Sequence, residues 1–508
     1  MKKYILAYDL GTGGNKASLY DQDLNLVSNN FISYETHYPN IGWHEQRPND
    51  WWEAVIKSTR NLLESSGIDK NSIECLSISG HSLGVVPIGK NGELLQESTP
   101  IWSDARAKEQ ADKFFNRIDQ DEWFQITGNG FAPENYSVFK IMWYRDSMPE
   151  MFNKIHKIVG TKDFVNYKLT GKILTDYSYA SGSGVFNLKE WDYSPHLMEA
   201  SDLSSNIFPR IVPSTNVIGK ITEKASKITG LPRDVKVICG GVDNSCMALG
   251  AKSFKEGRIY TSLGSSAWIA ISSKQPVIDV KNKAYTFAHV IPGMYTSAYG
   301  SFSAGSSYKW VKNNLLINQG EENKITYKQL DSLAKKSPVG AKKLIFNPNL
   351  AGGSAAHPSP NIRGAFLGLD LSHKTEDIIR ATLEGVALDL RILLDFIREK
   401  RELADEMLIV GGGTKSNLWM QIFADVYDME VIKTNIGQNA GSLGAAAIAA
   451  VGAGLWKNFD KIDEIHKILN VAKPLKKNVE RYNKLLVAFK YSNKFLSQLG
   501  NILSQINF

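Results

Sequence analysis

Several features that would identify other classes of protein are scarce in this chain of 508 residues. Its 3 cysteines, Cys75, Cys239 and Cys246, are an odd number without a CxxC pair, so neither a disulfide framework nor a cysteine-rich zinc site is indicated. No segment approaches the ~18 uninterrupted apolar residues of a membrane span. The apolar run after Lys2-Lys3 ends at Asp9, too early for a signal-peptide core. We therefore expect a soluble cytoplasmic protein without a membrane partner.

Charge of one sign is not concentrated anywhere, and several common motifs are missing. The 59 basic and 52 acidic side chains give a net charge of +7, and the surplus is scattered along the chain rather than clustered, which argues against a nucleic-acid partner. GxxxxGK[ST], GxGxxG and HExxH do not occur. A P-loop nucleotidase, a dinucleotide dehydrogenase and a zinc protease of the HExxH type therefore lose their usual support.

One literal catalytic motif is present. The segment Gly80-His81-Ser82-Leu83-Gly84 matches GxSxG, the nucleophile elbow of serine hydrolases, and it follows a predicted strand over residues 73–79. The elbow should then open a helix, whereas Val85-Val86-Pro87 predicts an extended segment. A hydrolase that uses Ser82 remains an alternative from a different functional class.

A strand, a small-residue turn and a second strand are predicted twice in this α/β chain. The first copy covers residues 4–20 and is followed by a predicted helix over residues 51–65; the second covers residues 260–271. Each copy contains Leu-Gly followed by a hydroxyl residue. The repetition suggests two duplicated domains with a cleft between them and a boundary near residues 251–257. Two unrelated hairpins that share Leu-Gly by chance are the alternative.

Three segments contain residues suited to phosphoryl chemistry. Asp9 ends a strand and is followed by Gly11-Thr12-Gly13-Gly14 and Lys16, a turn that can hold phosphate while the carboxylate holds Mg²⁺ through water. Asp243 follows another apolar strand, where it suits a general base for a hydroxyl proton, although capping of the next helix is an alternative. Gly411-Gly412-Gly413 removes side chains where a flat ligand could approach the backbone.

Taken in order, these segments resemble the FGGY carbohydrate kinases, and among them the xylulose-phosphorylating branch. The resemblance covers residues 4 to about 450. It is carried by Asp9-Leu10-Gly11-Thr12, Gly42-Trp43-His44-Glu45-Gln46 with Trp51-Trp52, Gly241-Val242-Asp243-Asn244, Ser262-Leu263-Gly264-Ser265, Arg363-Gly364-Ala365-Phe366 and Gly411-Gly412-Gly413.

The resemblance implies a fold, a reaction and a set of site residues. The fold would be two ribonuclease H-like domains of the actin, sugar kinase and heat-shock ATPase superfamily, here residues 1–252 and 253–508, on either side of a catalytic cleft. The reaction would transfer the γ-phosphate of Mg·ATP to a small sugar, with a pentulose such as D-xylulose as the first expectation. The implied residues are Asp243 as the base, Asp9 for the metal, His81, Ser82, Trp102, Asp104, Arg106 and Asn244 for the sugar, and Thr12, Lys16, Gly264, Ser265, Gly305, Gly411, Gly412 and Asn417 for ATP.

Two departures from the family pattern concern the sugar. Leu83 stands where these kinases commonly have a sugar-contacting histidine, so His81 either substitutes for it or is a hydrogen-bonded structural histidine. Residues 352–357, Gly-Gly-Ser-Ala-Ala-His, replace a family stretch that contains a charged pair. Other ketoses, polyols and sugar acids therefore remain alternative substrates. A non-catalytic actin-like nucleotide switch is a further alternative, and whether the chain forms a homodimer is left open.

Overall fold

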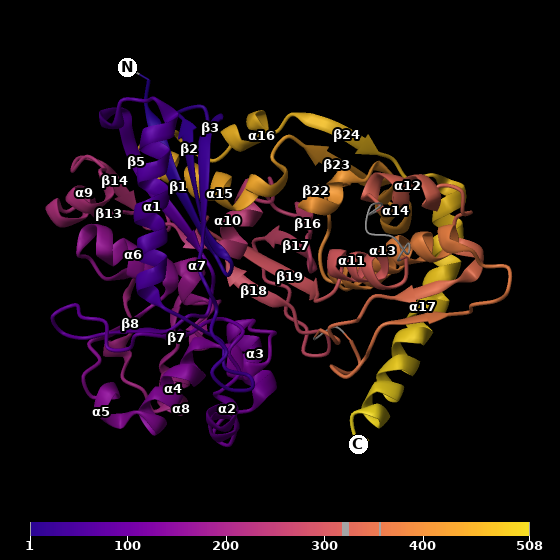
Figure 1. Ribbon diagram of the computed structural model, residues 1–508. Helices are drawn as coiled ribbons and strands as arrows, with labels where there is room; N and C mark the ends of the chain where they lie inside the picture. Colours follow the sequence, from indigo (N-terminus) through magenta and orange to yellow (C-terminus); the bar gives the residue numbers. More distant parts are fainter. Residues whose placement is uncertain (1, 317–324, 355–356, 507–508) are drawn as a thin grey trace. The chain divides into compact units, whose positions relative to one another are not determined.

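The computed structural model describes residues 2–316, 325–354 and 357–506 (Figure 1). The chain divides into two compact units, each assembled from three segments. The first unit contains residues 1–256, 272–297 and 439–466, and the second contains residues 257–271, 298–438 and 467–508. Within the described ranges, none of the helices combines the length and the apolar composition that a membrane crossing requires.

The first unit is built around a sheet of mixed direction with the strand order β13-β14-β5-β1-β2-β3, in which β15 also pairs with β5. β1 runs antiparallel to β2 and parallel to β5, and β5 runs parallel to β15. The strands of this sheet are β1 (Tyr4–Gly11), β2 (Gly14–Asp21), β3 (Leu26–Ser33), β5 (Ile73–Gly80), β13 (Val217–Lys220), β14 (Lys236–Ile238) and β15 (Gly241–Val242).

Helices and short strands complete the first unit. The helices are α1 (Pro48–Ser66), α2 (Lys108–Phe115), α3 (Gln120–Thr127), α4 (Ser137–Ser147), α5 (Pro149–Phe152), α6 (Thr161–Thr170), α7 (Tyr177–Ala180), α8 (Pro195–Ser201), α9 (Glu223–Thr229), α10 (Asp243–Gly250), α15 (Ala440–Gly452) and α16 (Lys461–Ile465). The short strands are β4 (Glu45–Gln46), β6 (Val86–Ile88), β7 (Thr99–Pro100), β8 (Lys157–Val159), β9 (Leu174–Asp176), β10 (Phe186–Asn187), β11 (Asp192–Tyr193), β12 (Arg210–Val212) and β18 (Tyr285–Ala288).

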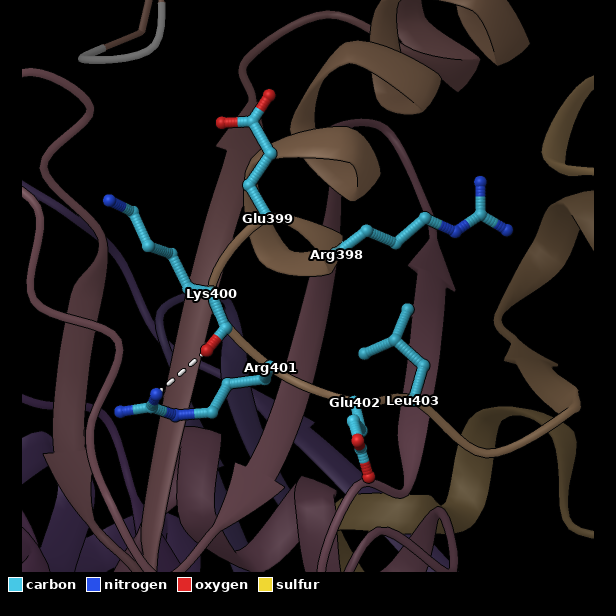
Figure 2. A pocket seen from close by; sticks show the side chains of 6 residues that line it. All are labelled: Arg398, Glu399, Lys400, Arg401, Glu402 and Leu403. Atoms are coloured by element: carbon cyan, nitrogen blue, oxygen red, sulfur yellow. Dashed lines mark hydrogen bonds between the residues drawn. The ribbon is translucent and has the colours of Figure 1, made fainter.

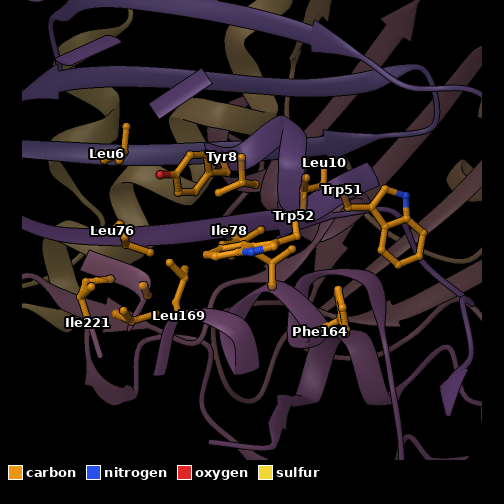
Figure 3. Packing of buried hydrophobic residues seen from close by; sticks show 14 of the residues in the cluster. Leu6, Tyr8, Leu10, Trp51, Trp52, Leu76, Ile78, Phe164, Leu169 and Ile221 are labelled. Atoms are coloured by element: carbon orange, nitrogen blue, oxygen red, sulfur yellow. The ribbon is translucent and has the colours of Figure 1, made fainter. Parts of the chain in front are cut away.

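Alternation along β1 decides which side chains face which helices. Leu6, Tyr8 and Leu10 lie on one face, in a core shared with Trp51 and Trp52 of α1 and with residues of α6 (Figure 3). Because successive side chains of a strand point to opposite faces, Asp9 lies on the other face. That face is covered by α15, which packs on β1 and β5.

The second sheet has the order β18-β19-β17-β16-β22-β23-β24 and repeats the pattern of the first. β16 runs antiparallel to β17 and parallel to β22, and β22 runs parallel to β23. Its other strands are β16 (Ile259–Leu263), β17 (Ala267–Ser273), β19 (Tyr295–Ser301), β22 (Glu406–Val410), β23 (Glu430–Thr434) and β24 (Ile468–Ala472). The remaining elements are β20 (Ile345–Asn347), β21 (Ala365–Leu367), α11 (Gly305–Asn314), α12 (Tyr327–Ala334), α13 (Thr375–Arg398), α14 (Asn417–Tyr427) and α17 (Lys476–Leu503).

The repeated architecture confirms the duplication predicted from the two strand-turn-strand segments. In both sheets a hairpin strand, β1 or β16, is flanked on its other side by a parallel strand, β5 or β22. One helix start was predicted wrongly. α1 begins at Pro48 with Arg47 at the cap position, rather than at residue 51. Proline is favoured in the first helical position because its fixed φ already suits a helix and its missing N–H would be unpaired there.

Candidate active site

Asp9 lies at the carboxyl end of β1, opposite Ser79 of the parallel strand β5. The Ser79 hydroxyl donates a hydrogen bond to Asp9 Oδ1 over 2.9 Å. The first turn of α15 approaches the other oxygen so closely that a Cβ on Gly441 would lie 2.9 Å from Oδ2. A helix N-terminus carries partial positive charge and favours an anion. Burial nevertheless raises the pKa of Asp9, while Lys16 and Ser79 act in the opposite direction.

Lys16 lies directly across the β1–β2 hairpin from Asp9. Its Nζ donates to Asn439 Oδ1 over 3.4 Å, just before α15 begins. The two residues that the sequence assigned to metal and phosphate are therefore neighbours on one sheet, and the start of α15 adjoins both.

Asp243 is the first residue of α10, and its half-buried carboxylate accepts a hydrogen bond from the Asn244 N–H over 2.8 Å. The cap position of this helix is Val242, which makes no side-chain cap hydrogen bond. Asp243 is therefore not the cap residue of α10, which was the alternative role considered for it. Burial, together with the negative charge of Asp9, raises the pKa of Asp243 to about 7. A carboxylate that titrates near neutral pH is suited to accept a proton during catalysis.

Neighbouring parallel strands bring these side chains to one edge of the first sheet. Ser79 pairs with Asp9 on one side and with Gly241 on the other, so β1, β5 and β15 end side by side. Ligands of open α/β sheets bind at the carboxyl ends of the strands. This edge of the first unit can therefore hold a hydroxyl-bearing substrate and a hydrated cation.

Thr12 and Trp102 are also brought together. The half-buried Trp102 donates from its indole N–H to Thr12 Oγ1 over 2.9 Å, and Gln46 donates to the Thr12 carbonyl over 2.7 Å. The sequence assigned Thr12 to phosphate and Trp102 to the sugar. Their hydrogen bond joins the turn after Asp9 to the segment that contains Trp102.

Asp104 and Arg106 form a buried ion-pair network rather than open binding groups. Arg106 contacts Asp104 Oδ2 over 2.8 Å and Glu45 Oε1 over 2.6 Å, with its guanidinium carbon 3.9 Å from the centre of the Trp43 ring. Asp104 is 0% exposed and also accepts from the His44 N–H. The two residues therefore hold the segments 42–46 and 101–106 together, and Trp102 belongs to the second of these segments.

The segment 80–84 lies inside the first unit. His81 is 1% exposed, 5.4 Å from Trp51 between ring centres, and 3.2 Å from the Thr161 hydroxyl. Burial lowers the pKa of His81 to about 4. This packing supports the interpretation of His81 as a hydrogen-bonded structural histidine. Leu83 is buried as well and has a left-handed backbone with φ of 61°.

No helix begins after Ser82. The chain bends at residues 82–83 and next forms β6. Ser82 itself is 8% exposed. The helix that a nucleophile elbow requires is therefore missing at this point of the chain, so the hydrolase alternative has no structural support.

In the second unit, three predicted nucleotide segments meet. The turn at Gly264-Ser265 follows β16 and accepts hydrogen bonds from the first turn of α11, including Gly305 N to Gly264 O over 3.0 Å. Gly411, with φ of 100°, follows the adjacent parallel strand β22, and a Cβ there would lie 2.6 Å from the Leu263 carbonyl. Glycine is therefore required at positions 305 and 411, because the neighbouring backbone comes too close to leave room for a side chain.

Gly412 and Asn417 are more open. A Cβ on Gly412 would meet only Gln438 Nε2, at 3.6 Å. Asn417 is exposed in the first turn of α14, and its Oδ1 accepts from Asn470 over 3.4 Å. Both residues therefore leave room for a ligand to approach them.

Comparison with known proteins decides the family. The profile for the N-terminal domain of the FGGY family of carbohydrate kinases matches residues 4–250, and the profile for its C-terminal domain matches residues 259–453. The chain belongs to the FGGY family. It is a sugar kinase with the family's two-domain fold, and its phosphoryl donor is ATP.

Relatives of this FGGY kinase carry different substrate names. Xylulose kinase from Lactococcus lactis subsp. lactis (strain IL1403) is 30% identical over 508 residues, 99% of each chain. Gluconokinase from Bacillus subtilis (strain 168) is 26% identical over 500 residues, which cover 96% of this chain and 95% of the relative. The ligand-bound structure of xylulose kinase from Lactobacillus acidophilus superposes with a TM-score of 0.89 at 25% identity, covering 97% of this chain and 98% of the other.

The segment 352–357, where the sequence departs from the family, is described only in part. Ala355 and Ala356 lie outside the described residues. The His357 side chain is buried, and its Nε2 lies 2.9 Å from Asp389 Oδ1 in α13. The His357 ring is therefore engaged within the second unit.

A surface pocket in the second unit is separate in sequence from every predicted site residue of the kinase. It is lined by residues 398–403, directly after α13 (Figure 2). Arg398 and Glu399 point away from Arg401, whose guanidinium donates to the Lys400 carbonyl. These charged side chains do not converge on a common point, so we assign no ligand to this pocket.

Sequence reasoning missed several residues around the site. Ser79 and Gly441 contact Asp9, and a buried network of Lys162, Asp176 and Ser178 adjoins Val242. Asp9 and Ser79 lie near the carboxyl ends of neighbouring parallel strands, which end at the same edge of the sheet. This shared position could have indicated the contact between them. Nothing local distinguishes the buried Lys162 from an exposed lysine.

Proposed function

We propose that this kinase phosphorylates a hydroxyl group of a pentulose such as D-xylulose, with Asp243 as the general base. The observation that carries the proposal is the placement of Asp243, a half-buried carboxylate at a strand end whose pKa is raised to about 7. Phosphoryl transfer needs mainly positioning and charge stabilisation, and the protein supplies a carboxylate that accepts the proton of the attacking hydroxyl. Asp243 would take that proton at its carboxylate oxygen.

The residues around Asp243 suit a small polyhydroxylated acceptor. Asn244, which adjoins the base, is half-buried and offers an amide. Trp102 presents an aromatic side chain next to Thr12, and Ser82 lies in the bend that follows β5. We assign these groups to sugar binding. Asp104 and Arg106 would act by holding the Trp102 segment in place, and His81 by filling the space between Trp51 and Thr161.

Magnesium fits the residues near Asp9. Among the described residues, no three His, Cys, Asp or Glu side chains are grouped to hold a metal ion. Mg²⁺ does not require such a group, because it is usually kept by one or two carboxylates, water and substrate phosphates. Asp9 would hold the hydrated ion, and its negative charge also acts on Asp243, whose pKa it raises. The ion would neutralise charge on the phosphates of ATP.

The glycine-rich turns of the second unit suit the nucleotide. Gly264 and Ser265 form an exposed turn directly after β16, where a phosphate could approach the backbone closely. Gly412 leaves an open surface for the flat adenosine, and Asn417 offers a polar side chain nearby. Thr12 and Lys16 would contact phosphate from the first unit.

The substrate is tested by coupled ADP release with Mg·ATP. The panel contains D-xylulose, D-ribulose, an aldopentose, glycerol and D-gluconate, each varied to saturation. We expect kcat/KM for one pentulose to exceed the others at least tenfold. Preference for gluconate would instead make the chain a sugar-acid kinase. A uniformly low response, with ATP binding intact, would remove the pentulose and direct the search to other acceptors.

The base is tested by Asp243→Ala with Glu223→Ala as the matched control. Both residues are the acidic first residue of a helix in the first unit, but Glu223 is exposed and pairs with Lys227. Loss of a general base lowers the rate by roughly 10²–10⁴-fold. We expect that fall in kcat for Asp243→Ala, with ATP binding retained, and wild-type rates for Glu223→Ala. Turnover above one tenth of wild type in Asp243→Ala would remove Asp243 from this role.

A further inference from the structure

The backbone that leads into Asp243 is held at three successive places by groups outside its own strand. The Cys239 carbonyl accepts a hydrogen bond from Asn166 Nδ2 over 2.8 Å, and the Gly240 N–H donates to the Ser214 carbonyl over 3.0 Å. The third contact is the nearest to Asp243. The Val242 N–H donates to the Ser178 hydroxyl over 2.9 Å.

The Ser178 hydroxyl is oriented by Asp176. It donates its proton to Asp176 Oδ2, so its lone pairs are turned to the Val242 N–H. Asp176 is itself fixed, because it caps α7, accepts from the Ser214 hydroxyl over 2.7 Å and forms an ion pair with Lys162 over 2.9 Å. Asp176, Ser178 and Lys162 are all 0% exposed. Water therefore does not compete for these hydrogen bonds.

β15 has little room to move away from the contact between Val242 and Ser178. A Cβ on Gly241 would lie 3.1 Å from Ser178 Oγ and 3.2 Å from Cys246 Sγ. Gly240 has φ of 78°, and a Cβ there would lie 2.1 Å from the Ile78 carbonyl. The strand is therefore packed directly against α7, β5 and α10.

We propose that Ser178, oriented by Asp176, is a positioning residue that fixes the start of α10 and so aims the Asp243 carboxylate at the acceptor hydroxyl. The inference rests on the proposed role of Asp243. A buried N–H without an acceptor is unfavourable, so Val242 would turn away to find a new partner once the hydroxyl is gone. A small misplacement of a catalytic group lowers the rate strongly while leaving substrate binding almost unchanged.

Ser178→Ala tests the proposal, and Ser214→Ala is its matched control. Both substitutions remove a buried serine hydroxyl that donates to Asp176 Oδ2, but only Ser178 also accepts from Val242. Ser214→Ala retains the backbone carbonyl that accepts from Gly240. If Ser178 served only as a hydrogen-bond donor to Asp176, both variants should lose activity alike. If it aims Asp243, only Ser178→Ala should lose activity.

We expect Ser178→Ala to lower kcat at least tenfold with KM for sugar and for ATP within about twofold of wild type, and Ser214→Ala to keep kcat within about twofold. The proposal is overturned if Ser178→Ala keeps kcat within twofold, if both variants lose kcat equally, or if only KM changes. Circular dichroism and the melting temperature check folding. Should Ser178→Ala not fold, Ser178→Cys keeps the volume with a weaker hydrogen bond, and a fall in kcat of at least threefold is then required.

Failure of this inference is distinct from failure of the proposed function. Asp243→Ala is assayed beside the serine variants on the same acceptor. An inactive Asp243→Ala with an unaffected Ser178→Ala would retain the base and remove the positioning role. An active Asp243→Ala would remove the base, and the inference with it.

Discussion

At the ends of their parallel strands, the two sheets of this kinase carry different groups. The first sheet carries carboxylates there, Asp9 near the end of β1 and Asp243 directly after β15, whereas the second carries Gly264 after β16 and Gly411 after β22. The strand pattern beneath them is the same. The difference lies in a few residues at or just beyond the ends of the strands.

These few residues create opposite electrostatic conditions on one scaffold. In the first unit, burial raises the pKa of Asp9 and Asp243, so these carboxylates accept a proton more readily than exposed ones. In the second unit, glycines leave backbone groups accessible and contribute no charge of their own. Duplication of a fold thus supplies two similar edges, and in the function proposed above the residues at these edges separate proton transfer from nucleotide binding.

The largest expected effect concerns pH and the first unit. If Asp243 must be ionised to accept a proton, kcat/KM for the sugar falls about tenfold per pH unit below its pKa of about 7. The negative charge of Asp9 helps to raise that pKa, so Asp9→Asn should move the acid limb to lower pH while reducing the rate overall. Profiles from pH 5 to 9 at constant ionic strength measure both. An acid limb at the same pH in Asp9→Asn would show that the two carboxylates do not interact.

A smaller effect is expected in the second unit. Gly412→Ala meets nothing closer than 3.6 Å, so folding should be unaffected, but a methyl group against adenosine should raise KM for ATP about tenfold without changing kcat. Gly413→Ala is the contrasting control, because its Cβ would lie 2.3 Å from Leu263 and should lower the melting temperature instead. An unchanged KM for ATP in Gly412→Ala would place adenosine elsewhere.

The smallest effect is a gain in stability. Asp243 has a pKa of about 7 in the folded protein against 3.8 as the ordinary value, so its ionisation opposes folding increasingly as the pH rises between them. Asp243→Asn removes this penalty. We expect its apparent melting temperature at pH 8 to rise by a few degrees, because each kcal/mol of penalty removed is worth about 2–4 °C in domains of about 150–250 residues and somewhat less in larger ones. At pH 4 the gain should vanish, and a gain of equal size at both pH values would assign the effect to packing.

Local patterns were sufficient to predict much of the fold. The apolar runs and small-residue turns at residues 4–20 and 260–271 identified both hairpins, and the helix predicted over residues 51–65 is α1 apart from its start. That start lies earlier than predicted because Pro48 occupies the first helical position. The assignment of residues 272–297 and 439–466 to the first unit could not be predicted, because it depends on contacts between distant segments.

The candidate site was predictable only where chemistry and position coincide. Asp9 and Asp243 combine a carboxylate with a strand end, and their roles remain predictions that the experiments above test. Asp104 and Arg106 show the limit of a motif: it names the residues but not that they pair with each other and with Glu45. Ser178 has no sequence signal of its own, since its importance comes from the Val242 N–H 64 residues later.

The late position of α15 in the chain has a consequence for synthesis. Residues 1–256 supply most of the first unit, but the helix that covers β1 and β5 and meets Asp9 begins only at Ala440. At ~5–20 residues per second, translation of the 182 residues from 257 to 438 takes roughly 10–40 s. During that time the face of the first sheet that carries Asp9 lacks the cover of α15, although α10, which also contacts β1 and β5, has already been made. Asp9 therefore leaves the ribosome long before the helix that meets it.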